Sequence, residues 1–205
     1  MAAAICAALR ERGESVTAFK PVVTGLDEPA GEWPPDHELL AGAAGTEPEA
    51  VAPYRFGPAV SPHYAAELAG ETVDPAHLLR TARAAHGVLV CEGVGGLMVP
   101  LTTGYLVRDL AVDLGLPVVI AAGTGLGTIN HSLLTVEAAQ AAGLRVAGIV
   151  MTPWPENPEP IELSNRDTVE RLAGTAVSGL PPTTPDTLAG AGHALPLDAW
   201  LVSRS

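Results

Sequence analysis

The sequence has few cysteines, few basic side chains and no long apolar run, and each shortage excludes a class of protein. Only 2 of the 205 residues are cysteine, too few for a small secreted scaffold held together by disulfides. Lysine and arginine number 11 against 23 acidic residues, and the net charge of −12 argues against nucleic acid or an anionic membrane as the main partner. No segment is apolar over the length needed to span a bilayer, and no signal peptide is recognisable. We therefore expect a soluble cytoplasmic protein in which Cys6 and Cys91 are reduced, buried thiols.

What the sequence does contain is typical of an α/β protein. Hydrophobic residues make up 47% of the chain and charged residues 17%. Helix-like and strand-like segments alternate, which predicts βα units joined by right-handed crossovers in a mostly parallel, doubly wound sheet. We expect a single domain over residues 1–205. The predicted helices are 1–12, 38–44, 64–68, 75–85, 107–114, 129–142 and 161–172, and the predicted strands are 15–20, 88–91, 117–122, 146–151 and 176–180.

The segment VLVCEGVGG, residues Val88–Gly96, places a carboxylate at the end of a strand. Four apolar residues without polar alternation predict a strand buried on both faces of a parallel sheet, and Glu92 follows it directly. Ligands of open α/β sheets bind at the carboxyl ends of the strands. Glu92 therefore either meets a cation there, with Mg²⁺ suited to a hard oxygen ligand, or it caps a turn or a helix.

Lys20 and Asp36 carry two further charges that suit such a site. The segment VTAFKPVVTG (Val16–Gly25) runs a strand into Lys20, where an ammonium group would neutralise phosphate or carbamate oxygens. Thr24 offers a hydroxyl a few residues beyond. Taken alone, Lys20 equally suits a surface position, and Asp36 equally suits a helix N-cap or a metal ligand. The next residue, His37, is expected to lie exposed on its helix.

The segment GTGLGTINHSLLT, residues Gly123–Thr135, follows a predicted buried strand and opens a helix. Small residues let the backbone approach a ligand closely, and the free amides of a helix N-terminus favour an anion. Asn130 and His131 fall in the first turns of this helix, where His131 fits packing or capping better than the role of a base. The segment is a candidate anion site.

Taken together, these segments resemble the dethiobiotin synthetase family, whose members have the P-loop NTPase fold. The resemblance covers roughly residues 1–180, and SPHYAAEL and GTINHSLLT are its most specific parts. The matching segments are KPVVTG (Lys20–Gly25), the region of Asp36, SPHYAAELAG (Ser61–Gly70), VLVCEGVGGLMVPL (Val88–Leu101), RDLAVDLGLPVVIAAGTGLGTINHSLLT (Arg108–Thr135) and AGIVM (Ala147–Met151).

The resemblance implies an ATP-dependent ligase of biotin biosynthesis. Such an enzyme forms the ureido ring of dethiobiotin from 7,8-diaminononanoate and CO₂ through a phosphorylated carbamate, with positioning and charge stabilisation rather than a covalent nucleophile. The resemblance makes Lys20 the catalytic lysine, and Asp36 and Glu92 the ligands of Mg²⁺. It also implies a homodimer, in which the start of the helix near Gly127 receives the substrate carboxylate across the interface. The implied nucleotide-binding residues are Asp36, Glu92, Gly93, Val94 and Gly95, and the implied substrate-binding residues are Thr24, Gly127, Thr128, Ile129 and Asn130.

The sequence departs from the family in two places. No G-x-x-x-x-G-K-[ST] segment occurs in it, and Met1–Leu9 matches the helix that follows the family's phosphate loop. We therefore expect a truncated domain whose first strand and P-loop lie upstream of Met1. Thr152 stands where many members carry an asparagine that reads the base, so the resemblance does not define the base preference. The alternative functions are a catalytically inactive relative or partner subunit lacking the P-loop, and another P-loop enzyme of the amidoligase type.

Overall fold

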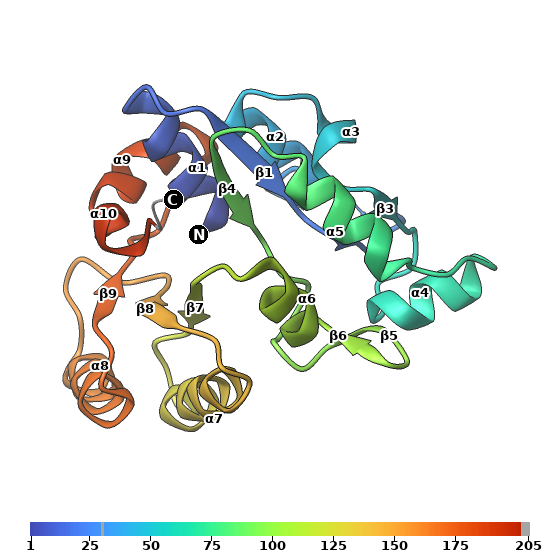
Figure 1. Cartoon of the computed structure of the whole chain (residues 1–205). Helices are drawn as coiled ribbons and strands as arrows, with labels where there is room; N and C mark the ends of the chain where they lie inside the picture. Colours follow the sequence, from blue (N-terminus) through green and yellow to red (C-terminus); the bar gives the residue numbers. More distant parts are fainter. Residues whose placement is uncertain (30, 202–205) are drawn as a thin grey trace.

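The computed structural model describes residues 1–29 and 31–201, in which helices alternate with strands (Figure 1). Each predicted helix and strand is present, and the boundaries differ from the predicted ones by at most two residues. The α/β class is therefore confirmed. The helices are α1 (Ala2–Glu11), α2 (Asp36–Ala44), α3 (Pro48–Val51), α4 (Pro62–Leu68), α5 (Pro75–Arg83), α6 (Val107–Leu114), α7 (Thr128–Ala141), α8 (Pro160–Ala173), α9 (Leu188–His193) and α10 (Leu197–Trp200), with a 3-10 helix, η1, at Pro185–Thr187. The strands are β1 (Val16–Phe19), β2 (Val22–Val23), β3 (Tyr54–Arg55), β4 (Val88–Cys91), β5 (Pro100–Thr102), β6 (Tyr105–Leu106), β7 (Val118–Ala122), β8 (Val146–Met151) and β9 (Val177–Gly179).

The long strands form two parallel groups within the described residues, where the sequence predicted one sheet. β1 pairs with β4, from Val16 opposite Val88 to Phe19 opposite Cys91, and β7, β8 and β9 pair in that order. β2 pairs with β3 in parallel, and β5 with β6 in an antiparallel hairpin. β4 and β7 are both edge strands of their groups. All four residues of β4 are half-buried, which corrects the expectation of a strand buried on both faces, because β1 covers only one of its edges.

Helices cover both faces of the three-stranded sheet, as a doubly wound fold requires. Successive residues of a strand point to opposite faces. Ile149 of β8 accordingly packs with Val136 of α7 and Val169 of α8, whereas Val150 packs in the cluster that contains Trp200 of α10. In Figure 1, α7 and α8 lie below β7, β8 and β9, and α9 and α10 lie above them.

The first helix packs closely against its neighbours because alanine fills its inner face. Ala4 and Ala8 are fully buried, and α1 contacts both α2 and α9. On α9, a Cβ at position 192 would collide with the carbonyl oxygen of Ala4, so glycine at this position allows the two helices to approach. A second apolar cluster, which includes Phe19, joins β1 and β4 to α4, α5 and α6.

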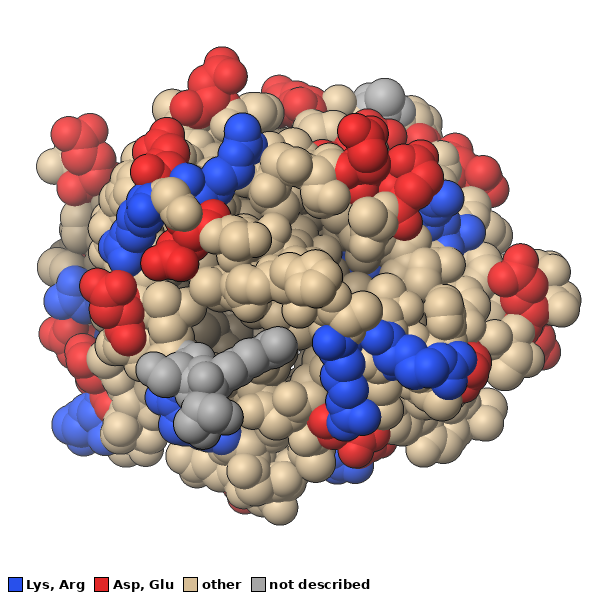
Figure 2. Space-filling view, turned by 45° about the horizontal axis from the view of Figure 1, so that its top comes forward, with Lys and Arg blue, Asp and Glu red and all other residues tan. Residues whose placement is uncertain are grey.

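Two further features are the lengths of the helices and the distribution of charged side chains on the surface. Among the helices formed by the described residues, none combines the length and apolarity of a membrane span. On the face seen in Figure 2, Lys and Arg side chains lie in small groups beside Asp and Glu.

Candidate active site

Lys20 lies directly after β1, beside the residue that follows β4. The amide of Lys20 donates to the carbonyl oxygen of Val51 (3.0 Å), and the amide of Glu92 donates to that of Phe19 (2.8 Å). The bond between Glu92 and Phe19 extends the parallel pairing of β1 and β4 by one residue, and the bond from Lys20 ties the chain to the end of α3, so Lys20 and Glu92 leave the same edge of the sheet. This is the carboxyl edge, where open α/β sheets bind their ligands.

The ammonium group of Lys20 meets both predicted carboxylates. Its Nζ lies 2.6 Å from Oε1 of Glu92 and 2.7 Å from Oδ2 of Asp36, and it also donates to the carbonyl oxygen of Gly93 at 3.4 Å. The Lys20 side chain is only 7% exposed, whereas those of Glu92 and Asp36 are 31% and 57% exposed. The structure therefore forms a lysine–dicarboxylate cluster, Lys20 with Asp36 and Glu92, with a buried cation and carboxylates open to solvent.

The environment of this cluster favours the charged form of the lysine. Burial by itself lowers the pKa of Lys20, but attraction to Glu92 and hydrogen bonds from Lys20 to Asp36 and Glu92 outweigh burial, and the net pKa is raised above its ordinary 10.5. Lys20 therefore carries its charge throughout the neutral range and cannot serve as a general base there. It is suited to stabilise negative charge on a ligand.

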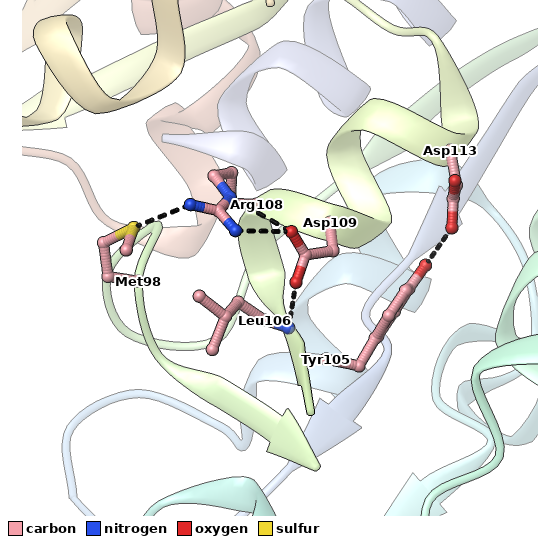
Figure 3. Close-up of polar contacts among 6 residues, drawn as sticks. All are labelled: Met98, Tyr105, Leu106, Arg108, Asp109 and Asp113. Atoms are coloured by element: carbon pink, nitrogen blue, oxygen red, sulfur yellow. Dashed lines mark hydrogen bonds and ion pairs between the residues drawn. The ribbon is translucent and has the colours of Figure 1, made fainter. Parts of the chain in front are cut away.

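The first turn of α6 supports the loop that follows Glu92. The amide of Arg108 donates to the carbonyl oxygen of Leu97 (2.8 Å). The turn itself is held by Asp109, whose carboxylate accepts from the amide of Leu106 (2.8 Å) and from the Arg108 guanidinium (2.8 Å) (Figure 3). The hydrogen bond from Leu106 is the main reason why the pKa of Asp109 is lowered, and Arg108 lowers it further.

A second polar region lies at the start of α7, on the loop Gly123–Gly127 that follows β7. It borders a cavity of about 280 Å³ whose lining includes Gly123, Gly125 and Leu126. Gly127 has φ +94°, a conformation that residues other than glycine rarely adopt, and it is the N-cap of the 14-residue helix. Within the described residues, no hydrogen bond or ion pair links this loop to the lysine–dicarboxylate cluster.

The oxygen donors of the cluster fit a magnesium ion. Asp36 and Glu92 both place a carboxylate oxygen against one Nζ, so the two groups converge, and both remain partly open to solvent. Mg²⁺ is commonly held by one or two carboxylates together with waters and substrate phosphates. Among the described residues there is no group of three or more His, Cys, Asp or Glu side chains able to hold a metal by themselves. The site therefore suits an ion that arrives with its own waters or phosphates.

The structure decides several open alternatives. Asp36 is the first residue of α2 and makes no capping bond with its side chain, and Lys20 is buried rather than on the surface. Thr24 is half-buried after β2, and its hydroxyl makes no hydrogen bond within the described part of the chain. The expectation that His37 is exposed was wrong: it is 6% exposed, because the inner face of α2 packs on α1 and β1.

Asn165 of α8 is a site residue that the sequence reasoning missed. It is buried and donates through Nδ2 to the carbonyl oxygens of Thr124 (2.9 Å) and Gly125 (3.3 Å) in the loop before α7. One signal was available, because Asn165 lies four residues before the buried Val169 and is therefore a polar residue on the inner face of its helix. The loop that it contacts lies 40 residues away in sequence, beyond the reach of such a pattern.

Comparisons with known proteins relate this chain to one family of enzymes. A family model described as an AAA domain matches residues 1–189. A protein of Anaeromyxobacter dehalogenans strain 2CP-1, named ATP-dependent dethiobiotin synthetase BioD, is 41% identical over 191 residues, which cover 91% of this chain and 84% of the relative. Proteins of the same name from Haloferax mediterranei and Bacillus licheniformis are each 37% identical, over 95% and 91% of this chain and 84% and 80% of their own lengths.

Proposed function

This chain belongs to the family of ATP-dependent dethiobiotin synthetases, and we propose that it closes the ureido ring of dethiobiotin from 7,8-diaminononanoate, CO₂ and ATP. It is thus an ATP-dependent ligase of biotin biosynthesis. The structural observation that best supports this proposal is the lysine–dicarboxylate cluster at the carboxyl edge of β1 and β4. Phosphoryl transfer needs such groups, because its catalysis is positioning and charge stabilisation.

The reaction proceeds through three bond-forming steps. One amine of the substrate takes up CO₂ and loses a proton, which gives a carbamate. An oxygen of the carbamate then attacks the γ-phosphorus of ATP, and ADP leaves. The second amine finally attacks the carbamoyl carbon and loses a proton, and the ring closes as inorganic phosphate leaves. Two neighbouring carboxylates keep Lys20 charged despite its burial, and we assign to its ammonium group the stabilisation of negative charge on the carbamate and phosphoryl oxygens.

We assign Mg²⁺ to the carboxylates of Asp36 and Glu92, because both offer hard oxygen ligands that converge on one point and remain open to solvent. When bound, the ion would neutralise charge on the phosphates of ATP. The loop Glu92–Gly95 lies beside this point and is assigned to the triphosphate. Gly95 has φ +64°, which turns the loop sharply after Val94.

We further propose that an additional strand and a phosphate-binding loop complete the sheet between β4 and β7. Both are edge strands in the described residues, and their side chains are apolar yet mostly only half-buried. An unpaired apolar edge is costly in water, and a parallel strand inserted between the two would pair both edges. This proposal keeps the chain within a single α/β domain.

The substrate side is assigned to Thr24 and to the start of α7, residues Gly127–Asn130. Thr24 follows the β2 strand close in sequence to Lys20, and the amides at the start of α7 suit a carboxylate. Because no hydrogen bond or ion pair among the described residues joins α7 to the lysine–dicarboxylate cluster, we assign the carboxylate of each substrate to the partner subunit of a homodimer. Exposed apolar side chains near α6 and α7 support such an interface: Met98, Val112, Leu126 and Leu134. We also propose a cytoplasmic location, which is consistent with the use of ATP.

The test is dethiobiotin formation by the polypeptide expressed from its whole reading frame. With ¹⁴CO₂, diaminononanoate and ATP–Mg²⁺, we expect one labelled dethiobiotin for each phosphate released. Omission of the diamine should abolish both products. Binding of diamine without turnover would instead favour the alternative of a catalytically inactive relative. Phosphate release without label in dethiobiotin would contradict the proposed reaction.

A further inference from the structure

We propose that Asn165 is a positioning residue that, together with Thr128, turns the amides of the loop Gly123–Gly127 toward the carboxylate of the substrate. This inference rests on the proposed function and adds to it a determinant on α8. Asn165 is not assigned to touch the substrate, and it acts through the backbone of the loop.

The side chain of Asn165 holds two successive carbonyl groups of this loop. It is 8% exposed, and its Nδ2 donates to the carbonyl oxygens of Thr124 (2.9 Å) and Gly125 (3.3 Å). An amide NH₂ has two protons, so both donors of Asn165 are used on the loop. A buried amide of this kind has no solvent to replace a lost partner, and its geometry is therefore firmly set.

Thr128 holds the carbonyl group that comes just before these two. Its hydroxyl is buried and donates to the carbonyl oxygen of Gly123 at 2.6 Å. Three successive carbonyl groups are thus bound to side-chain donors from two helices. The backbone then reverses at Gly127, with φ +94°, and enters α7.

The bound carbonyl groups leave the amides of the same loop available. In the described part of the chain, the amides of Thr124, Gly125, Leu126 and Gly127 donate no hydrogen bond. Successive free amides ahead of a helix N-terminus form a concave site with positive potential, suited to a carboxylate. Without Asn165 the carbonyl groups of Thr124 and Gly125 would lose their side-chain donors, and the orientation of the peptide groups that point the amides the other way would no longer be held.

A second observation, the buried hydroxyl of Ser132, points to a polar ligand at this loop. Ser132, one turn into α7, is 2% exposed, and its Oγ has no hydrogen-bond partner among the described residues. It lines the same cavity of about 280 Å³ as Gly123, Gly125 and Leu126. A buried hydroxyl without a partner is unfavourable unless a ligand or water supplies one.

The experiment compares Asn165→Asp with the wild-type enzyme on two substrates. Aspartate has the shape of asparagine but offers no donor to the carbonyl groups. We expect the KM for diaminononanoate to rise about 10- to 100-fold, with kcat and the KM for ATP within about twofold of wild type. Turnover of 2,3-diaminononane, which has a methyl group in place of the carboxylate, should be the same for both proteins. Asp167→Asn, an exposed change on the same helix, is the matched control.

Thr128→Val is the second variant, because it removes the donor to Gly123 from a different helix and should show the same split. An unchanged KM in both variants, or an equal loss on the substrate without a carboxylate, would overturn the assignment. If neither variant folds, as judged by its melting transition, the two donors maintain the fold rather than the site, and the inference is wrong. A wild-type enzyme that makes no dethiobiotin contradicts the proposed function. If the wild-type enzyme makes dethiobiotin but the two variants lack the KM split, only this inference is contradicted.

Discussion

Replacing Lys20 by methionine removes the cation of the lysine–dicarboxylate cluster while keeping a side chain of similar length. We expect kcat to fall by about 10²–10³-fold, which corresponds to about 2.7–4 kcal/mol of lost transition-state stabilisation. The reason is the fixed position of Nζ, which lies 2.6 Å from Glu92 and 2.7 Å from Asp36 in a side chain with 7% exposure. Arginine should not rescue activity, since its planar guanidinium group is larger and cannot meet both carboxylates from one atom.

The stability cost of Lys20→Met should be much smaller than its cost in activity. Breaking a fully buried ion pair costs about 3–5 kcal/mol. Here Glu92 and Asp36 are 31% and 57% exposed and regain hydration, so we expect a loss of about 1–2 kcal/mol in the free energy of unfolding. Arg12→Met is the matched control, because it removes a surface cation paired with Asp198 and should leave kcat unchanged.

The charge state of Lys20 can be measured directly because it is the only lysine in the 205 residues. In metal-free protein labelled with ¹⁵N-lysine, a single Nζ resonance should titrate above the ordinary 10.5, and Glu92→Gln should lower that pKa. A raised pKa means that the cluster stabilises the fold at pH values below 10.5 and that this contribution is lost as the pH rises through the folded-state value. Near-normal kcat in Lys20→Met, or a resonance that titrates below 10.5, would refute the reasoning.

Three further predictions follow from other contacts. Glu92→Gln and Asp36→Asn should each raise the Mg²⁺ concentration for half-maximal rate by about tenfold or more and change the KM for the diamine less; the reverse ranking in steady-state kinetics would show that they bind substrate instead. Asp109→Asn removes the acceptor for the Leu106 amide, so urea unfolding at pH 7 should show a loss of about 0.5–2 kcal/mol. Because the pKa of Asp109 is lowered from 3.8, the difference should vanish as the pH falls through the folded-state pKa, and a difference that persists in acid would contradict it. Burial raises the pKa of the Cys6 thiol to about 12, so iodoacetamide at pH 8 should label Cys6 only after unfolding, as read by mass spectrometry.

Local patterns in the sequence predicted that Lys20 and Glu92 follow strands but left the role of each open, and it was the family resemblance that grouped them with Asp36. Lys20 follows one apolar strand and Glu92 follows another, and parallel strands bring their carboxyl ends to one edge. The contact of Asp36 could not be predicted from its local sequence, because Asp36 could equally have capped α2. Only the structure shows that its carboxylate pairs with Lys20. Local patterns therefore predict which side chains reach the edge, whereas the pairing among them depends on the fold.

Elements without a strong local pattern were missed. β2 and β3 are two residues long and β5 and β6 are three and two, too short for any periodicity to be recognised. The hydrogen bonds of Asn165 join α8 to a loop 40 residues away, and the burial of His37 depends on how α2 packs on α1. These features arise from tertiary packing, which cannot be predicted from the helix and strand propensities of residues or from the spacing of apolar residues.

We propose that Lys20 becomes available to a substrate by exchanging one of its partners in the cluster. Its ammonium group has three protons, and three oxygens already lie near them, on Glu92, Asp36 and Gly93. To donate to a carbamate or phosphoryl oxygen, Lys20 must therefore give up one of these partners. The contact to Gly93 is the longest and is uncharged; of the two carboxylates, Asp36 is the more exposed and loses less when water replaces the lysine, so it exchanges at a lower cost than Glu92. Glu92, which is more buried and anchored at the end of β4, then keeps Nζ in place while the substrate takes the position that Asp36 leaves.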